Sequence, residues 1–241
     1  MARRPARRPA RRSAQPAAAA TPAAPESERD KIMAAFFALL AEKPLEQIGL
    51  AEIAARAAVS LVQLRDTFSS PLAIIAAHIK DTDRAVLGDD YSDMEEEPAR
   101  ERLFDVLMRR LEVLAPHRQA IRSLLRSARR NPPLVLALNS LAVRSQAWML
   151  TAAGIGTSGP QGILRAQGLA FLFGSVLRTW VRDDDPGLAR TMAALDRALG
   201  RGQRLTGLID DLCYIPSRLC RLRPRRRRRP DDFDDEESVA A

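Results

Sequence analysis

The chain has 241 residues, of which 46% are hydrophobic and only 5% aromatic, and its many Ala, Leu and Arg residues favour helices over sheets. The two cysteines, Cys213 and Cys220, fit neither a disulfide framework nor a zinc site, so we expect a reducing compartment. Neither a secretory leader nor a run of about 18 apolar residues is recognisable, which predicts a cytoplasmic protein.

The net charge of +8 arises from the ends of the chain. Residues 1–25 contain six Arg, residues 218–229 contain eight Arg, and residues 230–241 contain six acids, so residues 26–217 carry no net charge. The end segments are too biased in composition to bury apolar surface, and we expect them to be disordered. Such tails can solubilise the protein or hold the phosphates of DNA or of anionic lipid.

Helical patterns fill the chain between the tails. A first helix follows the N-cap Ser27 and ends before Pro44. Ser60 is a good N-cap for a later helix, and Pro71 takes the first position of another. After the first helix, the expected helices in the N-terminal part span residues 50–57, 61–67 and 71–87.

Longer amphipathic helices follow the polar segment 88–98. They are expected at residues 99–115, 117–130, 132–153, 161–182 and 186–199. The last begins where Asp185 can act as N-cap and Pro186 takes the first position. We therefore predict an all-α fold with four parts: a tail (1–26), a head (27–87), a body (97–202) and an amphipathic, charged C-terminal segment (203–241).

The stretch LAEIAARAAVSLVQLRDTF at residues 50–68 is typical of a helix-turn-helix. Ala54 allows the two helices to pack closely and Val59 fills the turn. Leu64 and Phe68 anchor the second helix to the core. Because the second helix of this motif enters the major groove of DNA, the pattern indicates a DNA-binding head.

With an apolar helix before it and a proline-started helix after it, the motif resembles the head of TetR-family transcription regulators. The resemblance covers residues 28–87 by motif and the helices to about residue 200 by number and order. It implies a homodimeric, ligand-responsive repressor whose heads bind DNA and whose bodies bind an unidentified small-molecule effector that releases the DNA. The sequence departs from the family's usual pattern. Ala58 stands where the family usually has Gly, and Arg65 stands where it usually has Tyr. The usual His near Thr67 is missing, and Pro71 stands where a Lys is common.

The resemblance places four residues where they can reach base edges or phosphates: Ser60, Gln63, Arg65 and Thr67. Gln63 can pair with an adenine edge, and Arg65 with a guanine or a phosphate. Asp66 would repel phosphate unless it faces Arg65 or accepts from a cytosine. Because residues 29–80 carry six basic and five acidic groups, the alternative is an inherited fold that no longer binds DNA.

Small residues recur every four positions in the expected helix 161–182: Gly162, Ala166, Ala170 and Gly174. Such a stripe lets another backbone approach closely. TetR relatives dimerise through their last two helices, so we predict a dimer face here, with packing inside one subunit as the alternative.

The apolar residues that can line an effector pocket, or simply form core, are Leu107, Met108, Leu111, Ile121, Leu125, Met149, Phe171 and Phe173.

Residues 113–182 contain nine Arg and no Asp or Glu. Within this stretch, Arg residues recur every four positions in the expected helix 117–130, at Arg118, Arg122, Arg126 and Arg130. Such a face is usually solvated; the alternative is recognition of an anionic effector or lipid headgroup.

His78 and His117 are isolated in the sequence. No catalytic set or phosphate-binding loop is recognisable, so we expect no catalysis, no metal and no cofactor.

The segment WVRDDDPGLARTMAALDR at residues 180–197 also resembles the lipid-binding accessory proteins of ubiquinone biosynthesis, which share this fold. Those proteins have a degenerate helix-turn-helix and a C-terminal amphipathic helix that contacts membrane. Here a short apolar face precedes the C-terminal Arg run: Leu205, Leu208, Ile209 and Leu212. This alternative predicts lipid binding and weak contact with a membrane surface, and a module that binds only proteins is a third possibility.

Overall fold

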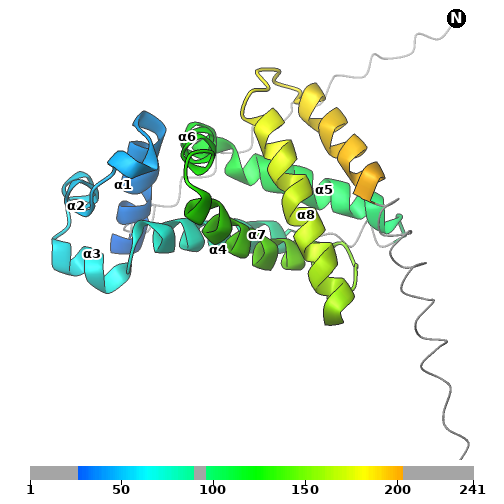
Figure 1. Cartoon of the computed structure of the whole chain (residues 1–241), viewed down its shortest axis with the longest axis horizontal. Helices are drawn as coiled ribbons and strands as arrows, with labels where there is room; N and C mark the ends of the chain where they lie inside the picture. The colour runs from blue at the N-terminus through cyan, green and yellow to red at the C-terminus, as the bar shows by residue number, and fades with distance from the viewer. Residues whose placement is uncertain (1–26, 90–95, 203–241) are drawn as a thin grey trace, which may run out of the picture.

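The computed structural model describes residues 27–89 and 96–202, and within these ranges the protein is all-helical. Figure 1 shows a small head, which contains the N-terminal helices, next to a longer helical body. The predicted fold class is confirmed. The tails, including the apolar face at residues 205–212 and both cysteines, lie outside the described residues.

The head consists of three helices and a short 3-10 turn: α1 (Glu28–Glu42), η1 (Leu45–Gln47), α2 (Leu50–Ala57) and α3 (Leu61–Thr67). Ser27 caps α1 as predicted, by accepting a hydrogen bond from the backbone N–H of Asp30 (3.2 Å). The head core forms where the apolar faces of the helices meet, and Ile32, Phe36 and Ile53 are fully buried there.

One helix, α4 (Pro71–Leu87), joins the head to the body. Ser70 caps it and Pro71 takes the first helical position, as the sequence predicts. Its first turns contribute Ile74 and Ile75 to the head core, and its last turn contributes Val86 to the body core. The same helix therefore belongs to both packing units.

The body contains one 3-10 turn and five longer helices: α5 (Ala99–Leu114), η3 (Ala115–His117), α6 (Arg118–Ala128), α7 (Pro132–Ala152), α8 (Gly159–Trp180) and a final helix over residues 189–202, orange in Figure 1. The body core lies between these helices. Leu107, Leu111 and Met149 are fully buried in it, and Trp180 closes it at the end of α8.

The final helix begins at residue 189 rather than at the predicted Pro186. Asp185 accepts hydrogen bonds from the backbone N–H groups of residues 187 and 189 (3.2 and 3.1 Å), so Pro186 lies in a turn before the helix. Asp183 accepts from the backbone N–H and the hydroxyl of Thr191 (2.8 and 2.6 Å). Two carboxylates thus satisfy backbone donors that a helix start leaves unpaired.

The head is fixed to the body through α6. Ser123 donates a hydrogen bond to the backbone carbonyl of Lys43 (3.1 Å), and Ser127 accepts one from the backbone N–H of Leu45 (3.1 Å). Both serines are buried, and Ala120 of α6 is part of the head core. Since breaking these bonds would leave buried polar groups unpaired, the head is held rigidly at this contact.

A buried ion pair joins α4, α5 and α7. Arg110 of α5 donates a hydrogen bond to Asp83 of α4, and Ser145 of α7 donates to the same carboxylate oxygen (2.7 Å). The Arg110 guanidinium also lies over the ring of Phe173 in α8, 5.6 Å from its centroid. The side chains of Asp83 and Arg110 are 12% and 5% exposed, so water cannot replace either partner.

Replacing Arg110 with Met should therefore lower the free energy of unfolding by about 3–5 kcal/mol, because the Asp83 carboxylate would remain buried without its counter-charge. Denaturant unfolding of the full chain measures this loss. The double variant Asp83→Leu/Arg110→Met should recover much of the stability. The control is Arg56→Met, which removes an exposed pair with Glu42 and should change little. Equal losses in the single and double variants would contradict the expectation.

Candidate nucleic-acid interface

α2 and α3 form the predicted helix-turn-helix, and Ala58 makes the turn between them. Ala58 has φ 54° and ψ 41°, in the left-handed region that glycine enters most easily. This geometry explains why a glycine is usual at the position, and an alanine here costs about 1 kcal/mol. The next residue, Val59, donates its N–H to the carbonyl of Ala54 (3.0 Å) and packs against the head core.

The start of α3 is held by a reciprocal capping box. Ser60 Oγ accepts from the backbone N–H of Gln63 (3.1 Å), and Gln63 Oε1 accepts from the backbone N–H of Ser60 (2.8 Å). The Gln63 amide nitrogen donates to Glu28 of α1 (2.5 Å). Both ends of the Gln63 amide are therefore bonded within the head, so these two bonds set the orientation of the side chain.

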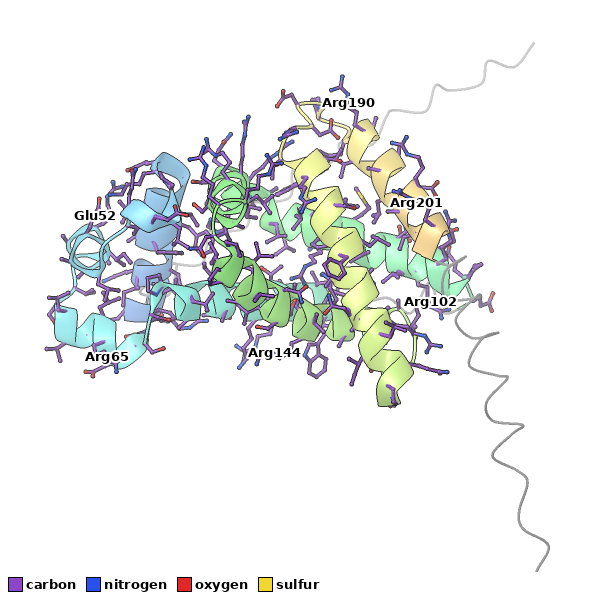
Figure 2. All side chains as sticks on the ribbon, in the orientation of Figure 1. Glu52, Arg65, Arg102, Arg144, Arg190 and Arg201 are labelled. Carbon is purple, nitrogen blue, oxygen red and sulfur yellow. The ribbon has the colours of Figure 1, made fainter. Side chains whose placement is uncertain are left out.

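Thr67 is also bonded internally, because its hydroxyl donates to the backbone carbonyl of Gln63 (2.8 Å). Arg65 is exposed and donates to the backbone carbonyl of Ser69 (3.4 Å). Figure 2 shows Arg65 at the outer edge of the head, on the side away from the final helix. Of the four predicted contact residues, Ser60 and Arg65 are exposed, whereas Gln63 and Thr67 are half-buried.

Four residues form the outer face of α3: Leu61, Val62, Arg65 and Asp66. Leu61 is 57% exposed and Val62 is 69% exposed. Sequence reasoning missed both, although Val62 lies two residues before the anchor Leu64 and is therefore out of phase with the buried side of the helix. The outer face combines two apolar side chains, one cation and one carboxylate.

Most residues predicted to line an effector pocket lie together in the body core. Leu107, Leu111 and Met149 are fully buried there, Ile121 is 8% exposed, and Met108 and Leu125 pack against them. Phe171 is 70% exposed on the outer side of α8, so the prediction that it lines an internal pocket is wrong. Phe173, two residues later, is buried in the body core, as is Trp180 at the end of the same helix.

The small-residue stripe of α8 faces the protomer's own interior. Gly162, Ala166 and Ala170 are buried, the two alanines at 2% and 7% exposure, and Gly174 is half-buried. A residue that its own chain covers cannot contact a second subunit, so the predicted dimer face is wrong at Gly162, Ala166 and Ala170, which pack within one subunit. Large apolar side chains are instead exposed elsewhere on α7 and α8: Val135, Leu136, Trp148, Ile163, Leu164 and Phe171.

His78 and His117, isolated in the sequence, are neighbours in the fold. Their ring centroids lie 4.7 Å apart, and both rings contact Phe37 of α1, at 4.2 and 4.8 Å. Burial, followed by the nearby His117 and Arg110, lowers the pKa of His78 to about 4, while Asp81 opposes the shift. Burial also lowers the pKa of His117. Within the described residues, no group of three or more potential metal ligands forms around this pair.

These pKa directions predict a pH-dependent stability. Between pH 6.5 and about 4 the unfolded chain binds a proton at His78 that the folded protein does not, so the free energy of unfolding falls as the pH falls. The His78 contribution to this loss reaches about 3 kcal/mol at most. Denaturant unfolding at pH 7, 6 and 5 should show a smaller fall for His78→Leu than for the wild type. Parallel curves for the two proteins would contradict the expectation.

The segment that resembles the ubiquinone accessory proteins forms a structural turn. Arg118 of α6 donates hydrogen bonds to the backbone carbonyls of Trp180 and Asp183, and its guanidinium lies 5.3 Å from the centroid of the Trp180 ring. Asp183 in turn holds Thr191. Arg118 therefore does not belong to the solvated face that the Arg spacing predicted. The other three residues of that face, Arg122, Arg126 and Arg130, are exposed. Through these contacts Trp180, Asp183 and Thr191 position the start of the final helix.

No family model matches the sequence, and the comparison with curated proteins finds no match. A TetR transcriptional regulator from Nitrosomonas europaea has a similar solved structure, with a TM-score of 0.58 at 24% identity, covering 74% of this chain and 99% of that chain. Another from Rhodococcus sp. RHA1 has a TM-score of 0.53 at 21% identity, covering 73% and 95%.

These likenesses show that the protein has the TetR fold. The resemblance predicted from the helix-turn-helix and from the order of the later helices is confirmed at this level. None of the described helices is both long enough and apolar enough to cross a membrane.

Proposed function

We propose that the protein is a DNA-binding transcription regulator of the TetR type. The observation that carries this proposal is the outer face of α3, which projects Arg65 and Val62 into solvent while Leu64 and Phe68 anchor the opposite side. The major groove of DNA admits one helix, and a short helix held by its cap and by two anchors fits this role. The TetR fold supports the same function.

The proposed active form is a homodimer that uses the exposed apolar residues of α7 and α8. Leu136, Trp148 and Phe171 are 72%, 58% and 70% exposed. Because α7 and α8 pack against each other and both expose large apolar side chains, this part of the surface is suited to burial by a partner. A second copy is the occupant that the function requires, because a two-fold axis would pair two heads for two half-sites of an operator.

Effector control acts through α4 in this proposal. Asp83 is bonded to Arg110 and Ser145 within the body, and Ile74 of the same helix lies in the head core. A small molecule that repacks the body core would therefore move or strain the helix that also supports the head. The expected coupling between effector and operator is about 1–3 kcal/mol, and it is reciprocal.

Selection of duplexes from a random library with the full chain tests DNA binding, at a salt concentration high enough to suppress binding by the Arg-rich tails. If α3 reads an operator, Arg65→Ala should weaken binding by about 1–3 kcal/mol and relax specificity at one base pair. Arg190→Ala is the matched control, because Arg190 is exposed at the start of the final helix, far from the head in Figure 2. Its affinity should equal that of the wild type.

Failure of the wild type to enrich any sequence would refute specific DNA binding. Isoprenoid or phospholipid that co-purifies with such a protein, together with binding to anionic vesicles, would then favour the lipid-binding alternative. A wild type that enriches an operator while Arg65→Ala binds it equally well would place the reading surface outside the outer face of α3.

Sedimentation of Phe171→Asp tests the dimer. A charge in the middle of an apolar interface should weaken dimerisation by about 2 kcal/mol or more, so the protein should shift toward monomer at micromolar concentration. Leu50→Asp is the matched control, because Leu50 is a 49% exposed apolar residue at the start of α2 in the head, outside the proposed face. A Phe171→Asp protein that remains dimeric would move the interface to another surface.

A further inference from the structure

The first two residues of α3 are apolar and project into solvent. Leu61 is 57% exposed and Val62 is 69% exposed, and neither belongs to the head core. Burial of apolar surface favours the folded state, and these two side chains contribute little to it. Their exposure at the start of α3 therefore leaves an apolar surface available to a partner.

The geometry of α3 directs these side chains to the place where a recognition helix meets bases. Leu64 and Phe68 are buried against the head, so the helical spacing turns Val62 and Arg65 away from it. The first turn contains no acidic residue that would repel phosphate. In helix-turn-helix proteins the N-terminal residues of the second helix contact base edges, and Leu61 and Val62 occupy this part of α3.

We propose that Val62, with Leu61 beside it, reads the methyl groups of thymines in the operator. The thymine C5-methyl is the apolar group that base pairs present in the major groove, and apolar side chains recognise it by contact. This inference rests on the proposed DNA-binding function and adds the class of sequence that is read. Arg65, one turn after Leu61, supplies the polar contact to a neighbouring base or phosphate.

The size of the apolar surface favours DNA over a protein partner. Protein interfaces commonly engage about 20–30 residues on each side, whereas this surface offers Leu61 and Val62 flanked directly by the charges of Arg65 and Asp66. Two aliphatic side chains match the few methyl groups that one half-site exposes. The broader apolar face on α7 and α8 is the surface suited to a second subunit.

Replacement of single thymines by deoxyuracil in the selected operator tests the proposal with the full chain. This change removes the methyl group and leaves every hydrogen-bonding group of the base in place. Loss of one contacted methyl should weaken binding about fourfold. The wild type should show this loss at one or two thymines in each half-site, and Val62→Ala should lose most of that sensitivity.

Leu50→Ala is the matched control, because Leu50 is a 49% exposed aliphatic residue of the head that lies on α2 rather than α3. Its ratio of thymine to uracil affinity should equal that of the wild type, even if its overall affinity changes. Since all these residues are exposed, equal melting temperatures should accompany the variants.

An operator that is bound equally well with uracil at every thymine position would overturn the inference and leave the proposed function intact. Uracil sensitivity that persists unchanged in both Val62→Ala and Leu61→Ala would also overturn it, because other residues would then contact the methyl groups. Failure to enrich any operator would overturn the inference together with DNA binding, and capture of a protein by the same face would account for its exposure.

Discussion

The placement of the head depends on α4 being held at both ends. Its first turns pack Ile74 and Ile75 into the head core, while Asp83 near its end is bound by Arg110 and Ser145 in a region that excludes water. This helix therefore has fixed contacts with the head at one end and with the body at the other. The serine contacts of α6 with the segment after α1 add a second, shorter connection between head and body.

The recognition surface combines rigidity with an unusual chemistry. The capping box fixes the start of α3, and the bond from Gln63 to Glu28 ties that start to α1. These bonds engage the side chains of Ser60 and Gln63, so the outer face is left with aliphatic residues, one arginine and one aspartate. Under the proposed function, selectivity on such a face would come from shape and methyl contacts as much as from hydrogen bonds.

The sequence was sufficient for features set by local chemistry. Ser27, Ser60 and Pro71 predicted helix starts because caps and prolines act through adjacent backbone groups. The side to which a helix turns its small residues is set by tertiary packing instead, so the stripe containing Ala166 was assigned to the wrong contact. His78 of α4 and His117 of η3 contact each other, and both contact Phe37 of α1. This contact depends on how the three elements pack, which no short-range sequence pattern encodes.

α7 and α8 are joined by a closed pair of amides. Asn139 and Gln167 each donate to the other's carbonyl oxygen, at 3.1 and 3.0 Å. Sliding one helix past the other by a single turn would leave both amides without partners, so this pair selects one axial register. Because Trp148 and Phe171 lie on these two helices, the pair also fixes the spacing of these two side chains within one protomer. In the proposed dimer, association would therefore cost chiefly rigid-body freedom, with little reordering of the helices themselves.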